Sequence, residues 1–198
     1  MIKKYVILCC FLIASASTFA QGGSSEVEQY VTKLLKDSVA VLDDHTLDSN
    51  TRYSKIKHML AENLDIIWMA RFTLGRNLKI IPKKDVERFI AAYSNYIVST
   101  YSKGFMEYKG QKAEIKSFDN LGNGFFIVKT HIIGHVDQQP IHVDYLARRV
   151  GDTYKIRDII TEGISLVNSQ RSEYASTIEN SGINQLIMLL EKHLAPQE

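Results

Sequence analysis

Three histidines with two aspartates beside them form the most metal-like group in this sequence. His131, His135 and His142 lie in one short stretch, with Asp137 and Asp144 among them. Imidazole and carboxylate groups are both ligands that zinc accepts. The stretch is nevertheless rich in strand-forming residues, and residues four apart on a strand are separated by about 13 Å. One ion could bind the first two histidines only at a sharp bend, which a neighbouring glycine could supply. We therefore predict solvated histidines on a strand face and no metal site.

Three carboxylates invite a comparison with general acid–base catalysts. Asp65, Asp158 and Glu162 could form a catalytic pair if two of them met. Nothing in the sequence brings them together, and three arginines are available as ion-pair partners: Arg71, Arg76 and Arg157. We predict that these carboxylates form ion pairs or cap helices.

Nucleophilic catalysis has little support in the sequence. Ser165 lies in "EGISLV", which does not match the Gly-x-Ser-x-Gly turn that exposes a catalytic serine. Cys9 and Cys10 are the only cysteines, and both lie in the first twenty residues. A chain that loses this segment has no thiol catalyst and no disulfide. We predict that the protein is not an enzyme and has no cofactor.

The first twenty residues have the three parts of a secretory signal peptide. Lys3 and Lys4 precede an apolar run, and small residues lead to Ala20. The run is shorter than the roughly 20 residues of a membrane span. We predict cleavage after Ala20, leaving one domain over residues 21–198. An uncleaved anchor is the alternative, and a lipoprotein signal fits less well because the cysteines come too early.

The charge balance argues against nucleic acid as a partner. The whole chain has 24 basic and 22 acidic residues, and removal of Lys3 and Lys4 leaves 22 of each. Nucleic-acid binders usually carry a basic excess. A local basic stretch, 79–88, could still steer the protein towards an anionic partner.

Apolar spacing predicts four helices in the first half of the chain. The first follows a capping box formed by Ser25 and Glu28, and the second begins near Asn50. A short helix covers 65–75, and a long one runs from Pro82 to about residue 108. The long helix carries a stripe of tyrosines and phenylalanines.

The second half of the chain changes from helical to strand-like patterns. Four β-rich runs cover 112–118, 124–134, 139–150 and 153–161, and turn-like residues separate them. Two helices, about 168–180 and 183–194, follow and are divided by Gly182. We predict an α+β fold with a helical layer on a twisted antiparallel sheet of four to five strands.

The aromatic helix and two strand faces could enclose an apolar cavity between the layers. The first strand face comprises Phe126, Val128, Thr130 and Ile132, and the second comprises Ile141, Val143, Tyr145 and Ala147. Ligand pockets are mostly apolar, with few polar groups. From the pattern alone a filled core is the more common outcome, so the residues leave both possibilities open.

Several motifs in this chain resemble one family. They are "MARFTLGR" at 69–76, "AAYSNYIVSTYSKGFMEYKGQ" at 91–111, "HVDYLARR", "YKIRDIITEG", "EGISLVNSQRSEY" at 162–174 and "SGINQLIMLLEKHL". In this order they resemble the MlaC family of periplasmic phospholipid-binding proteins, the toluene-tolerance auxiliary family. One departure is Asn77–Leu78, where an aromatic residue is common in the family.

The resemblance implies a periplasmic carrier that holds acyl chains in a deep apolar cavity and leaves the headgroup near solvent. It implies phospholipid as cargo and two partners, an inner-membrane ABC transporter with an MCE ring and an outer-membrane lipoprotein–porin complex. The residues expected to line the cavity are Trp68, Phe72, Tyr93, Ile97, Tyr101, Phe105, Phe126, Val128, Val143, Tyr145, Ile164 and Val167.

Two other classes of protein remain as alternatives. A small cone-shaped α+β enzyme, like the ketosteroid isomerases, would need an inward-facing Asp or Tyr at a pocket mouth. A ligand-free periplasmic adaptor would have a filled core and no extractable ligand.

Overall fold

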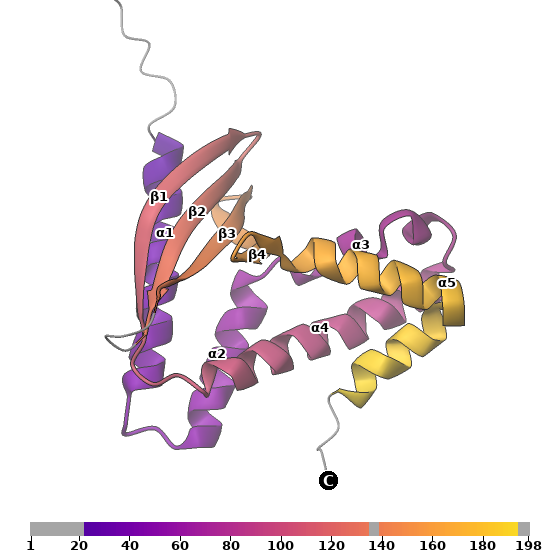
Figure 1. Ribbon diagram of the computed structural model, residues 1–198, viewed down its shortest axis with the longest axis horizontal. Coiled ribbons are helices and arrows are strands. Elements are labelled where there is room, and N and C mark those ends of the chain that lie inside the picture. The colour runs from indigo at the N-terminus through magenta and orange to yellow at the C-terminus, as the bar shows by residue number, and fades with distance from the viewer. Residues whose placement is uncertain (1–21, 135–138, 194–198) are drawn as a thin grey trace, which may run out of the picture.

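A curved antiparallel sheet and a group of helices beside it make up the fold (Figure 1). The computed structural model describes residues 22–134 and 139–193. The strands are β1 (Lys112–Gly122), β2 (Phe125–Ile133), β3 (Ile141–Val150), β4 (Thr153–Thr161) and the short β5 (Ile164–Ser165). They pair in chain order, each antiparallel to the next. The predicted α+β class and the predicted meander are confirmed.

Five α-helices accompany the sheet in the part of the chain that the structure describes. They are α1 (Gly22–Asp43), α2 (Ser49–Asn63), α3 (Ile66–Leu74), α4 (Lys83–Phe105) and α5 (Leu166–Lys192), with a 3-10 turn, η1 (Gly75–Lys79), after α3. Asp48 caps α2 because its carboxylate accepts hydrogen bonds from the backbone N–H groups of Asn50 and Thr51.

Three helix boundaries refine the expectations from the sequence. The first helix begins at Gly22, so the predicted cap at Ser25 is wrong, because that residue lies inside the helix. The long aromatic helix ends at Phe105 and not near residue 108, since its last turn contains Gly104 and glycine weakens helices. The predicted break at Gly182 is confirmed, because its φ of 78° and ψ of 167° interrupt α5.

The link between α2 and α3 joins the sheet along β4. Leu64, between α2 and α3, forms a parallel bridge with Ile156, and the Asp65 N–H donates a 2.8 Å hydrogen bond to the Ile156 carbonyl. The chain leaves the sheet through β5 and enters α5 directly. In Figure 1, α1 lies along the sheet, whereas α3, α4 and α5 extend away from it and pack on one another.

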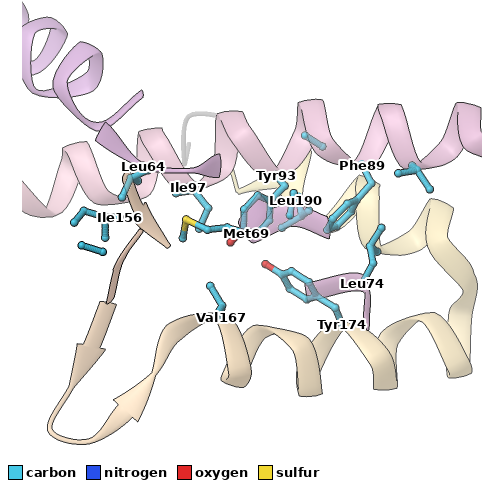
Figure 2. Close-up of a cluster of buried hydrophobic side chains, with 14 of the residues drawn as sticks. Leu64, Met69, Leu74, Phe89, Tyr93, Ile97, Ile156, Val167, Tyr174 and Leu190 are labelled. Carbon is cyan, nitrogen blue, oxygen red and sulfur yellow. The ribbon is translucent and has the colours of Figure 1, made fainter. Parts of the chain in front are cut away.

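The densest part of the core lies between α3, α4 and α5. Phe89 and Tyr93 of α4 meet Tyr174 of α5 edge to face, and Met69 and Leu74 of α3 complete the cluster (Figure 2). These side chains are at most 3% exposed. Burial of apolar area at about 25 cal/mol per Å² makes such a cluster the main stabilising element. No helix within 22–134 or 139–193 is both long and apolar enough to cross a membrane.

Candidate functional site

An apolar cavity of about 450 Å³ lies between α1, α2, the C-terminal half of α4 and one end of the sheet. This volume falls within the roughly 300–1,000 Å³ of small-molecule sites. The helices contribute Leu34, Leu35, Ser38, Val39, Leu42, Ile56, Met59, Leu60, Asn63, Tyr101, Gly104 and Phe105. The strands and links contribute Leu64, Glu107, Tyr108, Gln111, Ala113, Ile132, Ile141, Tyr145, Ile156 and Ile159.

Two polar side chains in the helical wall, Ser38 and Asn63, have hydrogen-bond partners within the protein. The Ser38 hydroxyl donates a 2.8 Å hydrogen bond to the Leu34 carbonyl. The Asn63 amide donates to the Met59 carbonyl at 2.8 Å, and its oxygen accepts from the Tyr30 hydroxyl at 2.9 Å. A ligand in the cavity would therefore meet aliphatic and aromatic surface, with little demand for polar groups of its own.

The tyrosines of the cavity report the same apolar environment. Burial raises the pKa of the Tyr101 phenol to about 12, with smaller contributions from Tyr96 and Asp158. Burial also raises the pKa of the Tyr145 phenol to about 12. Tyr145 lines the cavity, and its side chain is half-buried. Both phenols are therefore neutral at physiological pH.

The rim of the cavity lies near the link from α4 to β1. Three residues of the wall are exposed, namely Gly104, Glu107 and Ile141. The exposed lysines of the same stretch of chain are Lys103, Lys109 and Lys112. Three lysines against one glutamate give this segment a net positive charge. A ligand with an apolar body and an anionic end would fit this arrangement.

Three of the twelve residues predicted to line a cavity do so. Tyr101 and Phe105 come from the last turns of α4, and Tyr145 comes from β3. Tyr101 and Phe105 lie on the predicted aromatic helix, and Tyr145 lies on the second of the two predicted strand faces. Of those two faces, Ile132 and Ile141 also reach the cavity.

Six others lie away from the cavity wall, in the interior or at its edge. Five are at most 4% exposed and belong to the packed core, namely Tyr93, Ile97, Phe126, Val128 and Val167. Val143 is half-buried on β3, where its carbonyl accepts a 2.6 Å hydrogen bond from the Thr130 hydroxyl. The space between helix and sheet is thus filled over most of its length and open at one end.

The remaining three residues lie on the outside of the helical group. Trp68 and Phe72 stack on each other, with ring centroids 4.8 Å apart, and both are half-buried. Ile164 is 66% exposed in β5. None of the three contributes to the cavity wall.

Sequence reasoning missed the wall that α1 and α2 provide. Leu34, Leu35, Ser38, Val39 and Leu42 of α1 all face the cavity. The sequence contains a signal for this wall. Adjacent apolar pairs such as Leu34–Leu35 give α1 an apolar stripe that is wider than contact with one neighbouring element requires. Such a stripe indicates a helix that faces both the sheet and another surface.

The candidate carboxylates have structural partners. Asp65 accepts a 2.8 Å hydrogen bond from Nε of Arg157. Asp158 is buried and accepts from the Ser165 hydroxyl at 2.5 Å and from the Val167 N–H, in the first turn of α5, at 3.1 Å. The expectation of ion pairs and helix caps is confirmed for these two residues.

Glu162 and the histidines also have local roles. The Glu162 carboxylate accepts a 2.6 Å hydrogen bond from the His142 backbone N–H. The rings of His131 and His142 stack across β2 and β3 with centroids 4.4 Å apart. His135 and Asp137 lie outside the described residues. Within the described ranges, no three His, Cys, Asp or Glu side chains are grouped as a metal ion would need.

Comparison with known proteins gives the cavity a context. The family model described as "MlaC protein" matches residues 28–192, which is most of the chain. This chain belongs to the MlaC family. The match begins in α1 and ends with the last residue of α5, so it covers every element that forms the cavity.

Curated MlaC-type relatives align over nearly their full length. The intermembrane phospholipid transport system binding protein MlaC of Haemophilus influenzae is 21% identical over 94% of this chain and 88% of that protein. The toluene tolerance protein ttg2D of Pseudomonas putida is 22% identical over 89% of this chain and 81% of that protein.

A solved structure has the same fold. The phospholipid-binding protein of Ralstonia solanacearum, determined in complex with a phospholipid, superposes with a TM-score of 0.69. The alignment covers 87% of this chain and 96% of that chain, at 16% identity. At this identity the likeness establishes the shared fold and not the ligand.

Proposed function

We propose that this protein is a periplasmic phospholipid carrier that holds acyl chain in the cavity between α1, α2, α4 and the sheet. The observation that carries the proposal is the cavity itself, which is lined by apolar residues and sits in a chain of the MlaC family. The printed names of its relatives support it, since one is a phospholipid transport system binding protein and another structure contains a phospholipid.

Acyl chains supply the binding energy in this proposal. Each buried methylene contributes about 0.8 kcal/mol, so ten buried methylenes offer a gross term of roughly 8 kcal/mol. Ordering the chain and the protein reduces this sum. Because the cavity wall presents few unpaired polar groups, chain length sets affinity more than headgroup identity does.

The headgroup would lie at the rim, near Lys103, Lys109 and Lys112. These lysines are exposed and flexible, so they would attract a phosphate without selecting one headgroup over another. The arrangement fits a carrier that accepts several phospholipids and releases them.

The carrier would act between two membranes. In this proposal, residues 1–20 are removed on export, and the mature domain exchanges lipid with an inner-membrane MCE-ring ABC transporter and an outer-membrane lipoprotein–porin complex. The transport system named for the Haemophilus relative supports such partners. N-terminal sequencing of the protein from the periplasmic fraction should begin at Gln21.

The alternatives differ from the carrier in what the cavity must contain. An isomerase-like enzyme needs an inward-facing Asp or Tyr at the cavity mouth. Among the described residues no Asp lines the cavity, and its acidic residue, Glu107, is exposed at the rim, whereas Tyr101, Tyr108 and Tyr145 do line the wall. A ligand-free adaptor needs a filled interior, whereas this interior is open at one end. The open interior favours the carrier over the adaptor, and the lack of an Asp in the described wall leaves a tyrosine-based enzyme as the remaining rival.

The test combines native mass spectrometry with solvent extraction of the purified protein. The unchanged protein should carry phospholipid. Leu60→Trp, which fills the cavity from α2, should carry much less, and Lys57→Trp, on the exposed side of the same helix, should load normally. A lipid-free mass for the unchanged protein under gentle conditions would favour the adaptor.

A further inference from the structure

Three arginines and three aromatic rings form a continuous stack across the junction between the sheet and the helices. In spatial order this arginine–aromatic ladder comprises Arg148, Phe125, Arg157, Trp68, Phe72 and Arg171. The Arg148 guanidinium lies 4.3 Å from the Phe125 ring, and Arg157 lies 5.6 Å from that ring and 4.7 Å from Trp68. Trp68 stacks on Phe72, which Arg171 covers at 5.0 Å.

Two local backbone features build this ladder. Arg157 is the extra residue of a β-bulge, because Ala147 pairs with Ile156 and Leu146 pairs with Asp158. A bulge re-aims the side chain it carries. At the other end, a Cβ on Gly75 would lie 2.7 Å from Nε of Arg171, so Arg171 would have to shift if residue 75 carried a side chain. Its φ of +53° is also one that side-chain-bearing residues rarely adopt.

The charges of the ladder are largely uncompensated. Asp65 pairs with Arg157, and both side chains are mostly buried, at 20% and 16% exposure. Arg148 and Arg171 have no carboxylate within ion-pair distance among the described residues. The Nη1 atom of Arg148 is shielded from water and has no hydrogen-bond acceptor in the described part of the chain. The ladder therefore presents two cations that rings hold in place and no acid neutralises.

This arrangement suits recognition of carboxylates. A guanidinium held face-on against a ring keeps its N–H edge available for a bidentate hydrogen-bonded pair. Arginine, with its planar group, forms such pairs better than lysine. An acidic side chain of a partner would supply acceptors to Arg171, which is exposed, and to the guanidinium N–H groups of Arg148 other than the shielded Nη1.

We propose that the arginine–aromatic ladder is the docking surface for an acidic segment of a protein partner. Tryptophan, phenylalanine and arginine are the residue types enriched at the centres of protein interfaces. Ile67, next to Trp68, is 63% exposed and would add apolar contact. A bilayer surface fits less well, because membrane binding through charge uses clusters of about four to eight cations.

The ladder is separate from the lipid cavity. None of its six residues lines the cavity wall. The proposal rests on the proposed function in one respect, that the partner is a membrane-bound component of the machinery that gives or receives lipid. Docking and cargo binding can nevertheless be measured independently.

The experiment measures binding of the full mature protein to two probes from the same organism. They are the solubilised MCE-ring ABC transporter and the outer-membrane lipoprotein–porin complex. Arg148→Glu and Arg171→Glu should each weaken binding to at least one complex about tenfold or more. Arg171→Lys keeps the positive charge but loses the planar group that stacks on Phe72. Its affinity for the partner should therefore lie between those of the unchanged protein and Arg171→Glu. Lys57→Glu, which makes the same charge change on the exposed side of α2, should bind normally.

Lipid content and thermal melting of each variant identify which proposal fails. Lost docking with normal lipid content and a normal melt supports the ladder. Unchanged binding of both charge reversals, or no binding of the unchanged protein to either complex, overturns it. A loss seen only with phosphatidylglycerol vesicles also overturns it and assigns the surface to membranes. Absence of lipid from the unchanged protein contradicts the carrier function and leaves the docking measurement valid.

Discussion

The Tyr93 hydroxyl on α4 donates a 2.8 Å hydrogen bond to Oε1 of Gln170 on α5, inside the packed core. Both side chains are buried, at 0% and 7% exposure. The pair fixes α5 against α4 at a point where the surrounding contacts are apolar and permit sliding. It also satisfies two polar groups that would otherwise be costly to bury.

Removal of this phenol should therefore destabilise the protein without affecting its cargo. Tyr93→Phe leaves the Gln170 amide without a partner, which costs about 1–3 kcal/mol in the free energy of unfolding. Chemical denaturation measures the loss. Tyr93→Phe combined with Gln170→Leu should recover much of it, because both polar groups are then gone. A drop in lipid content at constant stability would show that the pair acts on the cavity.

A carboxylate in the cavity wall should prevent loading, and the same substitution outside the wall should not. Ile132→Glu places a charge where lipid would lie, and either its burial or its protonation costs several kcal/mol. Ile164→Glu lies on exposed β5 and should load normally. The family resemblance had predicted the opposite for Ile164. The lipid content of the two folded variants shows whether lipid lies against Ile132 in the cavity wall or against Ile164 in β5.

Stability should fall at alkaline pH. Burial raises the pKa of Tyr30, Tyr101 and Tyr145 to about 12, and raises those of Tyr93 and Tyr174 further. The unfolded chain loses these protons near pH 10, so between pH 10 and 12 the folded state binds more protons. The tyrosine contribution to the free energy of unfolding should be constant below pH 10 and decrease above it. Tyr145→Phe should reduce that slope, and an unchanged slope would show that Tyr145 is not buried in solution.

Headgroup identity should have little effect on binding. With equal acyl chains, phosphatidylethanolamine and phosphatidylglycerol should exchange into the cavity with affinities within about tenfold, because apolar burial dominates. Shortening both chains should weaken binding far more. A hundredfold preference for one headgroup would mean that polar contacts at the rim set selectivity.

Local features of the chain were predictable from sequence. The turns that separate the four strand-like runs, and Gly182, follow from residues with strong backbone preferences, so the meander and the break in α5 were foreseen. The ends of helices were less certain. Ser25 offered a cap but the helix starts earlier, since caps stabilise only modestly and other contacts can extend a helix.

The cavity and the ladder depend on contacts between distant segments. Periodicity identifies the apolar face of α4 but not whether its neighbours fill the space, so Tyr93 and Tyr101 were indistinguishable although one is packed and one faces the cavity. Arg157 meets Trp68 only because a bulge re-aims it, and no local pattern indicates a bulge at that residue.

The two halves of α4 have different surroundings. The first half is packed in the core, and the second half borders the cavity. Phe89, Tyr93 and Ile97 are clamped between α3 and α5, whereas Tyr101 and Phe105 project past the clamp into the cavity wall. If the cavity widened, the C-terminal half of α4 would move together with α1 and α2, which share the cavity wall, while the half that packs between α3 and α5 stayed in place. Cargo of different girth would then deflect only the tip of α4 with α1 and α2. The helices α3 and α5 would present one unchanging shape to the outside, whether the protein is full or empty.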